Sequence, residues 1–170
     1  MSESRRLFFA LWPDARQRER LRDLVSVQAK HLEGRTVNRG NWHVTLVFIG
    51  STPASAVPAL LDRAAAIPVL PFRLRFDRVE YWARPRIACL VPSIVPPELE
   101  SLHAALKTVL VDPGDTPEQH AYRPHVTLVR AARPFTTERL AQPATFEFDS
   151  FELVESISNH GDVRYMPVKQ

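Results

Sequence analysis

Apolar and polar residues alternate along several short stretches of the chain, which is the pattern of strands with one buried face. The clearest case is 72–81, where Phe72, Leu74 and Phe76 alternate with charged residues. Elsewhere apolar residues recur at helical spacing, and prolines or glycines separate the stretches. We expect strands at 5–12, 42–49 (ending at Gly50), 72–81, 86–91, 124–130 and 145–154 and in the closing residues 163–169, and helices at 14–31, 55–67 and 96–110.

A pentapeptide occurs twice in the chain. His43-Val44-Thr45-Leu46-Val47 returns 82 residues later as 125–129, and each copy follows a helix and a polar loop, at 34–41 and 112–123. A chance repeat of this length in such a chain has a probability of about one in a hundred. Duplication of a lobe is therefore the better explanation, and no linker separates independent domains.

The repeated motif has a defined geometry because side chains on a strand alternate between two faces. His43 and Thr45 share one face, and the valine and leucine between and after them share the other. The same holds for His125 and Thr127. If the apolar residues bury in each lobe and a pseudo-two-fold axis relates the lobes, two imidazoles and two hydroxyls face each other.

Such a group of side chains suits phosphodiester chemistry. Histidine titrates near neutral pH, so a pair of histidines can supply a general base and a general acid. Threonine hydroxyls can donate hydrogen bonds to phosphate oxygens. Two alternatives compete with this interpretation. The histidines could be ordinary half-buried polar residues, or they could bind zinc, although no third ligand stands at metal-ligand spacing.

Composition narrows the classes of protein. The 170 residues contain one cysteine, Cys89, and no apolar run close to the roughly 20 residues of a membrane span. No secretory signal pattern is present at the start, so we expect a reducing, cytoplasmic location and no membrane partner. The formal net charge of +3 is too small for a protein that coats nucleic acid. The basic residues are arginines apart from Lys30, Lys107 and Lys169. Arginine suits phosphate contacts, but a genome whose base composition favours arginine codons is the preferred explanation of this bias.

With the two His-x-Thr motifs in place, the sequence resembles the two-histidine phosphoesterase superfamily. Within it, the chain is most similar to the RNA 2′,3′-cyclic phosphodiesterases, also called 2′-5′ RNA ligases. The similarity covers six ordered blocks along nearly the whole chain. These blocks are RLFFALWPD (6–14), NWHVTLVFIG (41–50), RPRIACLVP (84–92), LHAALKTVL (102–110), YRPHVTLVR (122–130) and FELVESISNHGDVRY (151–165).

The resemblance implies an α+β fold of two pseudo-symmetric lobes, each an antiparallel sheet with outer helices, and an active site in the cleft between them. Residues 1–170 would form a single bilobal domain, with one motif lobe around 43–46 and the other around 125–128. It also implies hydrolysis of a terminal 2′,3′-cyclic phosphate on RNA or a nucleotide to a 2′-phosphomonoester, without metal or other cofactor. We expect a monomer.

The resemblance also implies roles for single residues. His43 would donate a proton to the leaving 3′-oxygen, His125 would accept one from the attacking water, and Thr45 and Thr127 would hold the phosphate. The repeat symmetry by itself does not decide which histidine is the donor. The same site could instead perform 2′-5′ ligation or cleave 2′-5′ oligonucleotides, or the lobes could be a non-catalytic RNA- or nucleotide-binding module.

Arg130 breaks the repeat, because Phe48 stands at the corresponding place in the first copy. The family commonly has arginine there, which makes Arg130 a candidate phosphate ligand, and an ion pair at the surface or between the lobes is the alternative. On an ideal strand its side chain would point away from that of His125, so it needs a bulge or the strand end to reach the phosphate. Three aromatic residues near the motifs could stack on a base, but packing is the preferred interpretation for each: Trp42, Trp82 and Tyr122. We expect the remaining histidines (His31, His103, His120 and His160) to be non-catalytic and Cys89 to be an inert core residue.

Overall fold

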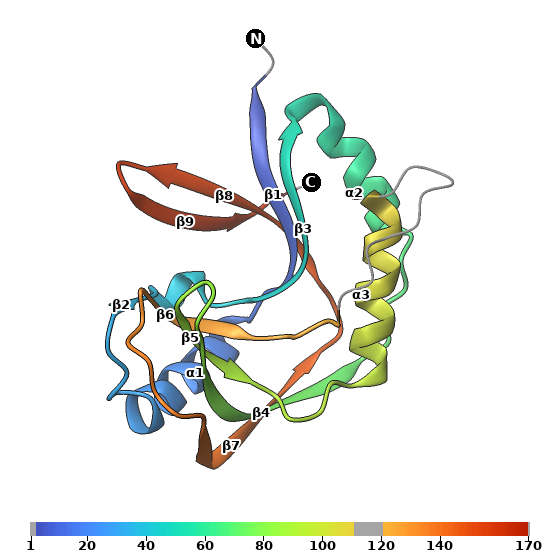
Figure 1. Cartoon of the computed structure of the whole chain (residues 1–170). Coiled ribbons are helices and arrows are strands. Elements are labelled where there is room, and N and C mark those ends of the chain that lie inside the picture. Colours follow the sequence, from blue (N-terminus) through green and yellow to red (C-terminus); the bar gives the residue numbers. More distant parts are fainter. Residues whose placement is uncertain (1–2, 111–120, 170) are drawn as a thin grey trace.

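The computed structural model describes residues 3–110 and 121–169, and this part of the chain contains three α-helices and nine strands (Figure 1). The strands are β1 (Ser4–Leu11), β2 (Arg35–Thr36), β3 (Val44–Pro53), β4 (Phe72–Trp82), β5 (Ile87–Val91), β6 (Val126–Arg130), β7 (Glu138–Phe148), β8 (Glu152–Asn159) and β9 (Asp162–Pro167). The helices are α1 (Ala15–Gln28), α2 (Val57–Ala65) and α3 (Pro97–Leu110), and short 3-10 turns lie at η1 (Arg39–Asn41) and η2 (Ala54–Ala56).

The strands form one antiparallel sheet that is narrow at its centre. Their order is β7-β4-β5-β6-β3-β1-β8-β9, and the short β2 pairs beside β6. Strands β3 and β6 are joined by a single residue pair, Val44 with Val126. The sheet therefore consists of two halves, β7-β4-β5-β6 with the added β2 and β3-β1-β8-β9, that meet at the two repeated motifs. This arrangement confirms the expected α+β fold of two pseudo-symmetric lobes.

The repeat extends well beyond the pentapeptide. The succession β1-α1-β3 returns as β5-α3-β6, and both helices have 14 residues with starts 82 residues apart. The lobes are nevertheless interleaved along the chain. Strands β8 and β9 join β1 and β3, while α1 packs on β7 of the other half and α3 packs on β3 (Figure 1). The half with β1 and β3 thus combines strands from both ends of the sequence, whereas β4 to β7 of the other half are consecutive in the chain and are joined by β2 and covered by α1 from its first part.

Helix α1 begins and docks through specific hydrogen bonds. Asp14 Oδ1 accepts from Gln17 N at 2.7 Å and Gln17 Oε1 accepts from Asp14 N at 2.9 Å, which satisfies two backbone donors at the helix start. Side chains further along donate to carbonyls of β7: Gln17 to Glu147 O, Arg20 to Thr145 O and Gln28 to Gln142 O. Because β7 is an edge strand, α1 covers backbone groups that would otherwise be free to pair with another chain.

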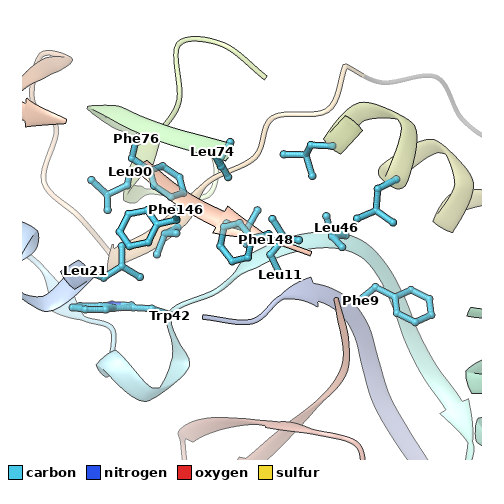
Figure 2. Packing of buried hydrophobic residues seen from close by; sticks show 14 of the residues in the cluster. Phe9, Leu11, Leu21, Trp42, Leu46, Leu74, Phe76, Leu90, Phe146 and Phe148 are labelled. Carbon is cyan, nitrogen blue, oxygen red and sulfur yellow. The ribbon is translucent and has the colours of Figure 1, made fainter. Parts of the chain in front are cut away.

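One apolar core lies between the helices and the face of the sheet that carries Val44 and Val126. It contains Leu21 of α1, Leu60 of α2 and Leu106 of α3 together with alternate residues of the strands. Figure 2 shows a part of this core, in which Leu21 and Trp42 lie near Phe76 and Phe146. Because the helices occupy this face, residues of opposite parity on β3 and β6 point to the other side of the sheet.

Several expected boundaries were wrong. The strand 42–49 was expected to end at Gly50, but β3 continues to Pro53 because Gly50 adopts φ +88° and still pairs with Leu7. The first helix ends at Gln28, before the expected 31, because Ala29 leaves the helical region at φ −130°. The alternating stretch 145–154 is two strands: β7 begins earlier, at Glu138, and β8 starts after a break at 149–151. The loop predicted at 112–123 lies largely outside the described residues.

Gly34 occupies a position where a side chain would be costly. Its φ is +140°, and a Cβ built there would lie 2.6 Å from Val129 Cγ1 and 2.9 Å from the carbonyl oxygen of Arg130. We expect Gly34→Ala to reduce the free energy of unfolding by about 2 kcal/mol, from strain and overpacking together. Urea denaturation measures this loss.

The matched control is Gly50→Ala. Gly50 also has positive φ, at +88°, but no heavy atom lies within 4 Å of a Cβ built there. This variant carries the backbone strain alone, about 1 kcal/mol. If Gly34→Ala proved as stable as Gly50→Ala, the steric part of the argument would be wrong.

Candidate active site

The four motif residues gather at the narrow centre of the sheet. Val44 pairs antiparallel with Val126, and both valines are buried in the core. Continuing this antiparallel register by one residue on each side sets His43 against Thr127 and Thr45 against His125. All four of these side chains are partly exposed and lie on the face opposite the helices. The pseudo-symmetry predicted from the repeat is therefore present in the geometry.

Matching β-bulges occur in both motif strands. In β6, Thr127 pairs with Cys89 and Val129 with Ala88, which leaves Leu128 as the extra residue. In β3 the register shift of the same kind leaves Leu46, which lies 82 positions before Leu128. Each bulge reverses the alternation of the residues that follow.

The bulge in β6 determines where Arg130 points. Leu128 and Val129 are consecutive and both buried in the core, so Arg130 returns to the face of Thr127. This is the condition that the sequence required for Arg130 to approach a phosphate. Its Nη2 donates to the hydroxyl of Tyr165 at 3.4 Å, and its charge contributes to lowering the pKa of both His43 and His125.

His43 is held by its Nδ1 nitrogen and surrounded by aromatic rings. Nδ1 lies 2.7 Å from the carbonyl oxygen of Asn41, and because a carbonyl can only accept, this nitrogen carries a proton. Nε2 lies 2.9 Å from Thr45 Oγ1, which donates to it when the ring is neutral. Burial lowers the pKa of His43 to about 4, with smaller contributions from the charges of His125, Arg130 and Arg18. The imidazole is therefore neutral at pH 7.

His125 repeats the Nδ1 hydrogen bond of His43. Its Nδ1 donates to the carbonyl oxygen of Arg123 at 2.9 Å, again two residues earlier in the chain. Burial lowers its pKa, and the charges of Arg123 and Arg130 lower it further. Because Nδ1 is engaged in both rings, each Nε2 remains as the nitrogen that can exchange a proton with a substrate.

Four residues that the sequence did not single out lie around His43, among them Phe8, whose ring centroid is 4.9 Å from that of the imidazole. Tyr165 meets the imidazole edge to face at a centroid distance of 5.0 Å, and Trp12 stacks on it at 6.1 Å. Asn41 ties the β8–β9 hairpin to the site, because its side chain donates to Val163 O at 2.7 Å and accepts from Tyr165 N at 3.0 Å. Only the hairpin's place in the fold brings Tyr165 here, and no local pattern signals it.

The three aromatic residues considered for base stacking are engaged within the protein. Trp42 is buried in the core. The Tyr122 hydroxyl donates to the carbonyl oxygen of Thr45 at 2.8 Å and its ring stacks on His103 at 4.1 Å. Trp82 lies against His125 at a centroid distance of 4.4 Å. The first two are packing residues, as expected, and Trp82 packs directly on a motif histidine.

The other histidines lie away from the motif face or outside the described residues, whereas Cys89 pairs with Thr127 and lies on that face beside Trp82. His31 pairs with Glu138 at 2.9 Å, and His160 lies in the turn between β8 and β9 at φ 45°. His120 is outside the described residues. Cys89 is fully buried, and burial raises the pKa of its thiol to about 12, which fits an unreactive core residue.

Across 3–110 and 121–169, no three His, Cys, Asp or Glu side chains gather closely enough to hold a metal ion. None of the helices in the same ranges has the length and apolarity needed to cross a membrane.

Comparison with known proteins defines the class of protein. The chain belongs to the 2′-5′ RNA ligase superfamily, whose family model matches residues 12–159. The resemblance drawn from the six sequence blocks is thereby confirmed. The match spans both His-x-Thr motifs, Arg130 and the whole of the β8 strand.

Individual relatives narrow the comparison further. The chain is 31% identical to an RNA 2′,3′-cyclic phosphodiesterase of Escherichia coli over 176 residues, covering 100% of this chain and 97% of the relative. It is 30% identical to a protein of the same name from Aeropyrum pernix over 65% of this chain and 64% of that one. The crystal structure of Escherichia coli LigT with 3′-AMP superposes with a TM-score of 0.84 at 31% identity, covering 98% and 97% of the two chains.

Proposed function

We propose that the protein hydrolyses a terminal 2′,3′-cyclic phosphate of RNA to a 2′-phosphomonoester, with His43 and His125 as the acid–base pair. The observation that carries the proposal is their placement on one face of the sheet, either side of the Val44–Val126 pair, with both Nδ1 protons bound to carbonyls. The relatives from Escherichia coli and Aeropyrum pernix that carry the name RNA 2′,3′-cyclic phosphodiesterase support the same reaction.

The reaction uses each histidine once. Water attacks phosphorus while the neutral His125 Nε2 accepts one of its protons. The bond between phosphorus and the 3′-oxygen breaks, and protonated His43 Nε2 donates its proton to that oxygen. The product carries a 2′-phosphate and a 3′-hydroxyl, and the two histidines have exchanged protonation states. The donor and acceptor assignment follows the family resemblance.

The phosphate itself prepares His43 to act as the acid. In the unliganded site the imidazole is neutral and Thr45 donates to its Nε2. A bound phosphodiester supplies a negative charge that favours the imidazolium and raises its pKa. Once Nε2 is protonated, the Thr45 hydroxyl is free to donate to a phosphate oxygen. Thr127 does the same from the other strand, and Arg130 supplies a positive charge on the same face.

Phosphorus NMR tests the reaction class. A short RNA with a 2′,3′-cyclic phosphate end is incubated with the protein in excess EDTA, and we expect conversion to a single 2′-phosphomonoester resonance. A 3′-phosphate product would contradict the regiochemistry. Conversion only after a divalent metal is restored would support a metallohydrolase, and product binding without turnover would support an RNA-binding module. With a 5′-hydroxyl RNA at high concentration, a 2′-5′ linkage would reveal ligation at the same site.

A further inference from the structure

A largely buried carboxylate lies behind His125. The side chain of Glu80 on β4 is 13% exposed, and its Oε2 accepts from Trp82 Nε1 at 2.8 Å and from Arg123 Nη2 at 3.0 Å. Its other oxygen, Oε1, lies 3.4 Å from Arg78 Nη1. One carboxylate therefore holds three groups on the side of the sheet that carries the motif histidines.

Two of these three groups contact His125. The Trp82 ring is tilted by 55° against the imidazole, with centroids 4.4 Å apart. The carbonyl oxygen of Arg123 accepts from His125 Nδ1, and the guanidinium of Arg123 lies 4.2 Å from the centre of the Trp82 ring. Glu80 thus does not contact the imidazole itself, but it binds Trp82 and Arg123, and both of these residues contact His125.

The charged groups around His125 include two arginines that lower its pKa and one carboxylate that pairs with one of them. Arg123 and Arg130 are the cations that lower its pKa after burial, and His43 faces it across the junction of the two lobes. From β4 come Glu80 and the Arg78 that pairs with it, and from β5 comes the Cys89 thiol, which stays neutral. Among the described residues, Glu80 is the anion that pairs with Arg123. Its charge therefore offsets the arginine next to the imidazole.

We propose that Glu80 is a positioning residue for His125: it holds Trp82 and Arg123 against the imidazole and offsets the charge of Arg123 at the proton acceptor. The proposal rests on the proposed function only in giving His125 a catalytic role. Glu80 touches neither the substrate nor the reacting atoms in this scheme. Its effect is on the orientation and the proton affinity of His125.

An NMR titration of the imidazole Cε1–H resonances tests this, with the His125 signal assigned by its loss in His125→Ala. Glu80→Gln keeps an oxygen acceptor for Trp82 Nε1 but removes the negative charge. We expect the pKa of His125 to fall by about half a pH unit. The reason is that the positive charge of Arg123 is then no longer neutralised by Glu80 and acts on the imidazole with only partial screening by solvent. Arg123→Met removes the cation and should move this pKa in the opposite direction.

Asp77→Asn is the matched control. Asp77 lies on the same strand with 12% of its side chain exposed, pairs with Arg75 at 3.4 Å, lies 4.0 Å from Arg78 Nε and accepts from Ser93 N at 2.9 Å. It has no contact with Trp82 or Arg123, so its variant should leave the titration of His125 unchanged. Folded Glu80→Gln and Arg123→Met proteins with an unshifted His125 would overturn the proposal, as would an equal shift in Asp77→Asn. The titration needs no substrate, so it stands apart from the test of catalysis.

Discussion

His43→Ala and His125→Ala should each lower kcat on a 2′,3′-cyclic phosphate RNA by about 10²–10⁴, the usual contribution of one general acid or base. In His43→Ala the 3′-oxygen would leave without a proton. In His125→Ala the water would attack without a base. Because the two residues act in one step, the double variant should lose less than the product of the two single losses. Initial rates of product formation give all three values.

His31→Ala is the control for this series. His31 is exposed and pairs with Glu138 on the far β7 strand, so its variant should keep nearly full activity. Circular dichroism and thermal unfolding establish that each variant is folded. A folded His43 or His125 variant with rates close to wild type would show that the pair is not the catalytic apparatus, whatever the reaction proves to be.

The repeat made the site residues predictable because the face on which each side chain lies follows from its position within the pentapeptide alone. Alternation within each pentapeptide placed His43 with Thr45 and His125 with Thr127, and the structure has both pairs on one face. The direct pairing of the two motifs could not be derived in the same way. It depends on the contact between Val44 and Val126, residues 82 positions apart, and alternation carries no information on which strands become neighbours.

Arg130 shows where alternation fails and how it can be repaired. Ideal parity turned its side chain away from the histidines, and one extra residue at Leu128 turns it back. Two adjacent apolar residues, Leu128 and Val129, are a weak sequence sign of such a bulge, because they equally suit a strand buried on both faces. The pairing with β5 distinguishes the two cases.

Tertiary contacts supply the rest of the surroundings. Tyr165 reaches His43 because the β8–β9 hairpin joins β1, and Glu80 reaches His125 because β4 joins β5. Strands β8 and β9 follow the second motif in the chain but lie in the half of the sheet that contains the first motif, and β4 follows the first motif but lies in the half that contains the second. This exchange of strands between the two halves creates both contacts. In the sequence, Glu80 and Tyr165 are an acid and a tyrosine in alternating strands, and no local pattern indicates that either lies next to a motif histidine or its neighbours.

The lowered pKa of His43 predicts that the protein loses stability as the pH falls. Histidine has a pKa of about 6.5 in an unfolded chain, and burial lowers that of folded His43 to about 4. Between these values the unfolded state binds a proton that the folded state does not, so protons favour unfolding. The loss begins as the pH drops below about 6.5 and is complete below about 4. The pKa difference corresponds to about 3 kcal/mol of unfolding free energy.

Urea denaturation of wild type and His43→Gln between pH 7 and pH 4 isolates this contribution, because other titrating groups are common to both proteins. The wild type should lose about 3 kcal/mol more than the variant over this range. Inorganic phosphate should reduce the difference, since an anion beside the imidazole favours its charged form and raises the pKa of folded His43. Parallel stability curves for the two proteins would mean that His43 titrates normally and that the site is open to water. In that case the imidazole could be protonated before substrate arrives, and the phosphate would not be what prepares the acid.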